Sequence, residues 1–367
     1  MISRFLILVC LVFCTGCASF NSPIDWNKPR ISGPEKGPAA VARAREEVAA
    51  GNAKRALERL RVAEEVKGLT ADQKDEIATL IEQVVEIRIE ELSREGKDPK
   101  QLAKMLDLDL PNQLAVAAGV RAARMYQDGG KPYKAFKLLR KVEEKYPRHH
   151  GKVEAGEILA EAGLQLADDP RSFLGFFAKR DDGIQVLEFL VITYPSEPRC
   201  AEAYFKLAKI YEEDRLWILA RQRHEDLRLW HPDTPYAVAS EASIPRLRLR
   251  ALKSPEYERR ELLKARFELE EWLRTHAGHK LEPRVRVDYT DCLLRLIEND
   301  LSVARFYRRI DQEYGARLHG DRALADAQAA RLTEAEERAR DLLESLPPPG
   351  KSTGSPLDSA QPVGVGQ

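Results

Sequence analysis

The residues with the greatest capacity for chemistry are histidines and cysteines. His276 and His279 are three positions apart, so on a helix they would share a face and could offer two imidazole nitrogens to zinc. No third ligand follows at a suitable spacing. The chain also lacks the nucleotide-binding pattern G-x-x-x-x-G-K-[ST] and the zinc-protease pattern H-E-x-x-H. We therefore predict no metal site, no cofactor and no enzyme activity.

The remaining reactive side chains fit structural roles. His224 occupies a helix seam, where we expect a hydrogen-bonded core histidine. His149 and His150 follow Pro147 in a turn, and we expect both to be exposed to solvent. Two cysteines fall on expected helix faces and could pair in an oxidising compartment, but we expect buried free thiols. These cysteines are Cys200 and Cys292.

Arginines are concentrated in one part of the chain and allow two interpretations. They either form solvated helix surface, or they line a basic strip on a concave face that pairs with carboxylates of a partner. On helices they would point in several directions, which favours solvated surface. The residues are Arg215, Arg221, Arg223, Arg228, Arg246, Arg248 and Arg250.

Composition limits the class of protein. The 367 residues carry a net charge of +0, and 32% of them are charged. A neutral chain shows no basic excess for a phosphate backbone, so we expect no nucleic-acid partner. Five cysteines are too few for a disulfide framework in a chain of this size. The composition is that of a helix-rich body.

The N-terminus has the pattern of a secretory signal. A basic start is followed by an apolar run that is too short to span a bilayer, and then by Thr15-Gly16-Cys17. This tripeptide resembles a bacterial lipobox, although Cys14 replaces the usual leucine. The resemblance implies that Cys17 is the lipidated first residue, with acyl chains such as palmitate. Ala18 and Ser19 lack the aspartate of inner-membrane retention, which implies anchoring in the outer membrane, facing the periplasm. The alternative is an ordinary signal that is cleaved near Ala18.

The segment from Glu202 to Pro232 predicts a helical hairpin. Tyr204, Leu207, Ala208 and Tyr211 fall at helical spacing, and Ala220, Leu227 and Pro232 follow. The pattern resembles the tetratricopeptide repeat. Small residues would lie where the two helices approach most closely, and Pro232 would end the second helix. Such a hairpin cannot bury its apolar faces alone, so neighbouring hairpins must stack on it.

The same spacing recurs along the chain. Tyr126 and Ala135 are nine positions apart, as are Tyr211 and Ala220. Weaker copies are centred near Leu60, Leu187 and Leu269, and Gly51-Asn52 marks a turn. We predict an all-α fold, a tetratricopeptide-like α-solenoid of stacked helical hairpins. The predicted parts are a signal peptide at 1–17, a flexible tether at 18–38, N-terminal repeats at 39–170, a second set of repeats at 171–310, capping helices at 311–346 and a disordered tail at 347–367.

Two insertions interrupt the repeats. The first is an aromatic loop that would either plug the end of the core or serve as a hydrophobic docking loop. Its aromatic residues are Phe173, Phe176 and Phe177, and Asp181-Asp182-Gly183 follows. In the second, Ser254-Pro255 would start a new helix. Pro245 would kink the helix before it or begin a fresh turn.

Residues 183–310 carry a closer resemblance. The steps Tyr194-Pro195-Ser196-Glu197-Pro198 and Leu301-Ser302-Val303-Ala304-Arg305-Phe306-Tyr307 are similar to those of the tetratricopeptide lipoprotein of the outer-membrane β-barrel assembly machinery, the BamD-like family. About a third of the chain is covered. Arg309-Ile310-Asp311 departs from the expected turn, so no contact residue is carried over there.

The function that follows is a lipid-anchored scaffold whose repeats bind an unfolded outer-membrane polypeptide or a partner subunit. The groove residues that we predict are Tyr204, Tyr211, Trp217, Arg221 and Arg228. The alternative is a structural envelope protein that links the membrane, the cell wall or copies of itself. A hydrolase of wall polymers is disfavoured because paired acids occur only as helix-surface charge.

Overall fold

The computed structural model contains only helices as regular secondary structure in the part of the chain that it describes, which confirms the predicted all-α class. Cys17, Phe173, Phe176, nearly all of the tether and nearly all of the predicted tail lie outside this part. The described residues are 36–66, 69–96, 98–108, 110–168, 177–252 and 259–347.

The chain divides into two compact units, Met1–Arg94 and Glu95–Gln367. The first unit holds the hairpin of α1 (Lys36–Ala49) and α2 (Ala53–Glu64), together with α3 (Ala71–Glu95), which ends at the boundary. The sequence predicts a boundary at 170/171. No division falls there, because the helices on its two sides pack against each other as a hairpin.

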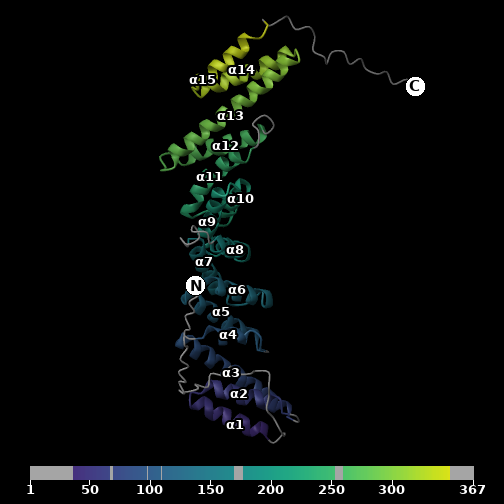
Figure 1. Cartoon of the computed structure of the whole chain (residues 1–367), viewed down its shortest axis with the longest axis vertical. Helices are drawn as coiled ribbons and strands as arrows, with labels where there is room; N and C mark the ends of the chain where they lie inside the picture. Colours follow the sequence, from purple (N-terminus) through teal and green to yellow (C-terminus); the bar gives the residue numbers. More distant parts are fainter. Residues whose placement is uncertain are drawn as a thin grey trace, which may run out of the picture. The chain divides into compact units, whose positions relative to one another are not determined.

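In the second unit, consecutive helices lie side by side in chain order (Figure 1). Each helix packs chiefly on the helices directly before and after it, and first helices of neighbouring hairpins also touch. This is the arrangement of a tetratricopeptide-like solenoid, as predicted. The helices are α4 (Pro99–Met105), α5 (Asn112–Asp128), α6 (Pro132–Lys145), α7 (Lys152–Ala167), α8 (Phe177–Thr193), α9 (Cys200–Glu213), α10 (Trp217–Trp230), α11 (Pro235–Ala251), α12 (Arg259–Thr275), α13 (Glu282–Arg309), α14 (Glu313–Ala329) and α15 (Thr333–Glu344).

The predicted hairpin at 202–232 is formed by α9 and α10. Leu207, Ala208, Ala220 and Leu227 are completely buried between the helices. Because alanines stand at the crossing, the two backbones approach closely while larger neighbours fill the seam. The second helix ends at Trp230, two residues before Pro232, whose ring disfavours a helical residue in front of it.

One turn geometry closes five of the hairpins. In each, a residue with positive φ stands two positions before the second helix, and the amide after it bonds to the carbonyl five residues earlier. In the α9–α10 turn, Arg215 has φ 59° and Leu216 N donates to Tyr211 O over 2.8 Å. This is a Schellman motif, which satisfies carbonyls left open at a helix end. The positive-φ residues are Gly51, Gly130, Arg215, Asp311 and Arg331.

The structure corrects the predicted first insertion. Helix α8 begins at Phe177 and continues through Gly183, so Phe177 belongs to a helix and not to the predicted docking loop. A Cβ on Gly183 would lie 2.6 Å from the backbone nitrogen of Ala167. This glycine therefore brings α8 against α7, where a side chain would collide with the backbone.

The region around the second insertion also differs from its prediction. Helix α11 runs from Pro235 to Ala251 without a break at Pro245. The predicted helix start at Ser254-Pro255 lies outside the described residues, and α12 is seen from Arg259. Toward the C-terminus, α14 and α15 occupy the region where the sequence predicts capping helices.

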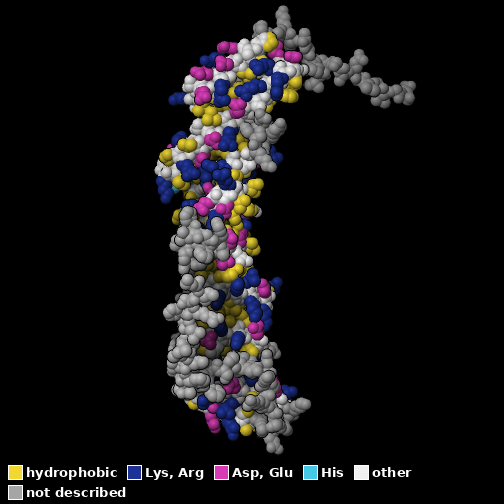
Figure 2. Space-filling model, in the orientation of Figure 1, with side chains coloured by type: hydrophobic (Ala, Val, Ile, Leu, Met, Phe, Trp, Pro, Cys, Tyr) yellow, Lys and Arg dark blue, Asp and Glu magenta, His cyan; other side chains and the backbone are white. Residues whose placement is uncertain are grey.

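The described helices include none that is both long and apolar enough to cross a membrane. Positive and negative side chains are intermixed over the visible face of α13 to α15 (Figure 2). Such mixing follows from the many oppositely charged pairs one helical turn apart, for example Arg317 with Glu313 at 2.9 Å.

Candidate functional site

Two of the five predicted groove residues lie in the core. Tyr204 is 2% exposed and donates its hydroxyl proton to Val191 O over 3.0 Å. Tyr211 is 9% exposed and donates to Glu188 Oε1 over 2.6 Å. Burial raises the pKa of both phenols. The prediction that these two rings contact a partner is not supported, because both are enclosed between helices.

The other three predicted groove residues lie on one face of α10, at positions i, i+4 and i+11. Trp217 is half-buried, with the Arg250 guanidinium 5.5 Å from its ring centroid. Arg221 bonds to Glu225 on its own helix over 2.8 Å. Arg228 is exposed near the end of α10.

The arginines between α10 and α12 are mostly paired with carboxylates, and one of them is buried. Arg248, at 4% exposure, bonds to Glu261 over 2.7 Å and to Glu268 over 2.9 Å. Arg223 bonds to Glu188 over 3.0 Å. The expectation of solvated arginines is wrong at Arg248, because this guanidinium on α11 is buried against α12 and bonds to two glutamates there. Periodicity could not reveal that its partners stand 13 and 20 residues away.

The structure places a different concave site where the first helices of three successive hairpins meet. We call it the hollow; its volume is about 250 Å³. Helices α9, α11 and α13 provide most of the lining, and α10 contributes one residue. The lining residues are Phe205, Lys209, Glu212, His224, Ala239, Ala242, Ser243, Arg246, Leu281, Arg284, Val285 and Asp288.

None of the five predicted groove residues lines the hollow. The sequence does contain a signal for this lining, because the lining residues of α9, α11 and α13 follow one another at helical spacing within each helix. In α9 the row is Phe205, Lys209 and Glu212, at positions i, i+4 and i+7. It stands beside the core row that includes Tyr204, and the tetratricopeptide spacing marks only the core row.

An aromatic cluster forms one wall of the hollow. The Phe205 ring lies 5.2 Å from Tyr236 and 5.6 Å from His224, between ring centroids. Lys209 Nζ stands 5.1 Å from the centroid of Phe205. This geometry holds the ammonium group over an aromatic face, where the ring quadrupole attracts it.

Below this wall, a serine, a histidine and a glutamate form a hydrogen-bonded chain. His224 Nδ1 is 2.8 Å from Ser240 Oγ, and His224 Nε2 is 3.3 Å from Glu212 Oε1. The residue types match those of a hydrolytic triad. Ser240 is 0% exposed, however, so its hydroxyl is closed to a substrate. The chain instead satisfies a buried histidine, as predicted for His224.

Burial and the neighbouring Arg246 determine the charges of His224 and Glu212 in this row of hydrogen bonds. Burial lowers the pKa of His224, which favours the neutral imidazole. Burial alone would raise the pKa of Glu212, but hydrogen bonds from His224 and Arg246 lower it. The Arg246 guanidinium lies 2.9 Å from Glu212 Oε2. Glu212 is therefore an ionised carboxylate that neutralises Arg246.

The other acid in the hollow, Asp288, differs from Glu212 because no cation of the described part of the chain contacts it directly. It is half-buried, and it forms no ion pair or hydrogen bond within the described residues. Burial raises the pKa of its carboxyl, against the opposing influence of Arg246, Arg284 and Arg250. The hollow thus contains a carboxylate close to several cations without direct contact.

Metal-ligand geometry is not found among the described residues, where no group of three or more His, Cys, Asp or Glu could hold an ion. His276 stacks on Trp272 with ring centroids 4.9 Å apart. His279 Nδ1 accepts a hydrogen bond from Leu281 N over 3.1 Å. Both histidines thus have structural contacts at the α12–α13 turn.

Cys200 and Cys292 are free and buried, as expected. Burial raises the pKa of each thiol to about 12. At neutral pH both remain protonated, which makes them poor nucleophiles.

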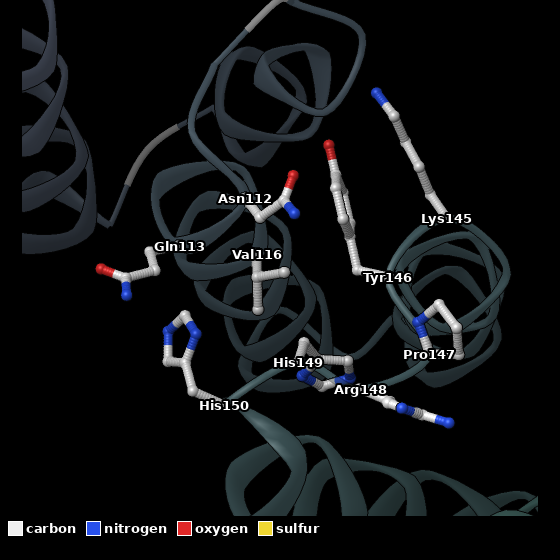
Figure 3. Close-up of a pocket in the computed structure, with 9 residues that line it drawn as sticks. All are labelled: Asn112, Gln113, Val116, Lys145, Tyr146, Pro147, Arg148, His149 and His150. Carbon is white, nitrogen blue, oxygen red and sulfur yellow. The ribbon is translucent and has the colours of Figure 1, made fainter.

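A second hollow lies between the start of α5 and the connection from α6 to α7 (Figure 3). The exposed cationic residues Lys145 and Arg148 line it. His149 also lines it, but this side chain is buried, with Nε2 bonded to Glu143 over 2.7 Å. The prediction that His149 is exposed is wrong, because a buried glutamate under the turn attracts the ring inward.

Comparisons with known proteins find two solved structures of low similarity. No family model matches the chain, and no curated protein does. A solved structure of PilF from Pseudomonas aeruginosa is 14% identical, with 84% of this chain and 97% of that chain covered at a TM-score of 0.24. A tetratricopeptide repeat protein from Parabacteroides merdae is 12% identical, with 83% and 99% covered at a TM-score of 0.24.

Proposed function

We propose that this protein is a non-enzymatic scaffold that binds another polypeptide through its helical hairpins. The hollow is the observation that carries the proposal. It combines an aromatic wall with charged side chains from three consecutive hairpins, and repeat arrays bind partners on surfaces of this kind. Its one hydrolase-like chain of residues has an inaccessible serine.

We further propose that the scaffold is anchored in the outer membrane through lipid on Cys17, faces the periplasm, and acts in assembly of outer-membrane β-barrel proteins. The support is the lipobox-like Thr15-Gly16-Cys17 and the resemblance of residues 183–310 to the BamD-like family. Several acyl chains anchor a protein stably where one does not, since each buried CH₂ contributes about 0.8 kcal/mol.

Two measurements test this proposal. Affinity purification from envelope extracts in mild detergent should recover the barrel-inserting subunit, and its repeated absence would exclude a role in barrel assembly. Cys17→Ala should release the protein from the outer-membrane fraction. A variant that remains in that fraction would exclude the lipid anchor.

A structural envelope protein that binds copies of itself is the second candidate. Apolar side chains are exposed along the end of α13 and the start of α14. These residues, Phe306, Ile310, Tyr314 and Leu318, follow one another at intervals of four positions. Concentration-dependent association in ultracentrifugation, without recovery of any assembly subunit, would favour this candidate.

A further inference from the structure

The hollow contains two cations that the protein does not neutralise by direct pairing. Lys209 on α9 and Arg284 on α13 are exposed, and neither forms an ion pair with a carboxylate among the described residues. Arg246, the third cation of the lining, is already paired with Glu212. Lys209 and Arg284 are therefore available to a carboxylate from outside.

An aromatic wall stands beside these cations. Phe205 is half-buried and contacts Tyr236, so part of its ring surface borders the hollow. A ligand that carries both an acid and an aromatic ring could bring the acid to Lys209 and pack its ring on this wall.

Asp288 opposes the binding of such an acid, because it is itself an acid in the same hollow. Its carboxylate lines the same hollow and stands in the field of Arg284 and Arg246, without a direct partner among the described residues. An entering carboxylate would meet repulsion from Asp288, and it would draw on the same guanidinium groups.

We propose that the hollow binds an acidic, aromatic-containing segment of a partner protein, and that Asp288 is an internal competitor which weakens this binding in the free protein. The inference rests on the proposed scaffold function and names the chemistry of its partner. Asp288 occupies the electrostatic position of a ligand acid, so its removal should improve the site.

The charge distribution favours a carboxylate segment over other anions. Asp288 and Glu212 both line the hollow, and they would repel a doubly charged phosphate more strongly than a single carboxylate. A nucleic acid would require a wider basic surface than Lys209 and Arg284 provide. An aromatic wall also has little to offer a phosphate headgroup.

The test uses the full-length mature protein in detergent and two labelled peptides. One peptide has four glutamates around a phenylalanine, and the other has glutamines in place of the glutamates. Fluorescence anisotropy should show tighter binding of the acidic peptide, and higher salt should weaken it. Equal binding of both peptides would overturn the proposal.

Three variants then examine the individual roles. Asp288→Asn should tighten binding of the acidic peptide about twofold to fivefold, the range of one partly screened charge pair. Lys209→Gln and Arg284→Gln should each weaken it by a similar factor. Circular dichroism verifies that each variant is folded. If a variant does not fold, the salt dependence of peptide binding by the unmodified protein takes its place as the test.

Asp291→Asn is the matched control, because Asp291 stands on the same helix, pairs with Arg295 at 3.0 Å and lies outside the lining. It makes the same charge change and should alter affinity less than about twofold. Equal effects of the two aspartate variants would overturn the proposal. So would preferential binding of a lysine-rich peptide that is lost in Asp288→Asn.

The outcomes separate this inference from the proposed function. If the acidic peptide binds as expected but the barrel-inserting subunit is not recovered, the hollow's chemistry stands and the role in barrel assembly fails. If the subunit is recovered equally with Asp288→Asn and with the unmodified protein, and the peptides do not bind, the scaffold stands and this inference fails.

Discussion

At the scale of single residues, Gly183 lies closest to neighbouring backbone among the described glycines. Its missing side chain leaves room for the backbone of α7, where a Cβ would lie 2.6 Å from Ala167 N. We predict that Gly183→Ala lowers the free energy of unfolding by about 2–3 kcal/mol, since backbone cannot yield as a flexible side chain does. Urea unfolding followed by circular dichroism measures this.

Gly156→Ala is the matched control for that variant. It also lies on a buried helix face, but its nearest neighbour is the end of the Glu197 side chain at 3.3 Å. We expect a change below about 1 kcal/mol, because helix propensity favours alanine and Glu197 can move. Similar losses of stability in both variants would show that the close backbone contact between α7 and α8 does not cause the effect of Gly183→Ala.

His224 gives the protein a predictable response to acid. Its pKa is lowered by burial, so below about pH 6.5 the unfolded chain binds a proton that the folded protein resists. Stability should therefore fall as the pH drops from 7 toward 5. Glu212, whose pKa is also lowered, adds a further loss below about pH 4.5.

The measurement is the urea midpoint at several pH values. In His224→Gln the decline between pH 7 and 5 should be shallower, because the titrating group is gone. An unchanged slope in this variant would assign the acid response to other residues.

The buried Asp300 joins three helices. This carboxylate on α13 is 0% exposed. It lies 2.7 Å from Arg259 Nη1 at the start of α12 and 2.8 Å from His319 Nδ1 on α14. We predict that Asp300→Ala lowers stability by about 2–4 kcal/mol, because it removes the carboxylate that balances a partly buried guanidinium and leaves only its bond to Asn299. Thermal unfolding measures the loss. A change below about 1 kcal/mol would mean that water replaces the carboxylate.

At the scale of elements, the hairpin turn offers a stabilising substitution. Arg215 holds φ 59°, a region that side chains with a Cβ rarely adopt. Arg215→Gly should raise the free energy of unfolding by about 0.5–1 kcal/mol by relieving this conformation. Arg228→Gly, within helix α10, should lower stability by a similar amount. A loss of stability in both variants would contradict this explanation of the turn.

The hairpins could be predicted from sequence because a nine-residue spacing marks them. Tyr126–Ala135 and Tyr211–Ala220 were found by this spacing, and Tyr307–Ala316 obeys it as well. That third copy lies where the resemblance to the BamD-like family ends. Asp311 performs in its turn the role that Gly130 performs earlier, and an aspartate is a weaker sequence marker of positive φ than a glycine.

The site was less predictable than the fold. Helical periodicity identifies which residues are buried, and it selected Tyr204 and Tyr211 as notable aromatics without distinguishing core from groove. The hollow depends on rows from α9, α11 and α13, which meet only because the hairpins stack in chain order. Pairing of Arg248 with Glu268, twenty positions away, likewise depends on tertiary contact.

At the scale of the whole molecule, stability should differ along the second unit. Helix α7 packs against α5, α6, α8 and α9, whereas α15 packs only against α13 and α14 among the described elements. A terminal repeat has fewer neighbours to hold it in place. We predict that amides of α15 exchange with deuterium faster than those of α7, as measured by mass spectrometry. Equal protection would indicate that the unit unfolds as a single block.

The shared turn also has a consequence for how the chain can change in length. A Schellman turn fixes the number of residues between the last carbonyl of one helix and the first turn of the next, so inserting a residue there would break the bond from Leu216 to Tyr211 or its counterpart. The connections from α6 to α7, from α8 to α9 and from α10 to α11 show no such bond. Relatives of this protein should therefore keep the same count of residues in the five shared turns and differ in length at other connections.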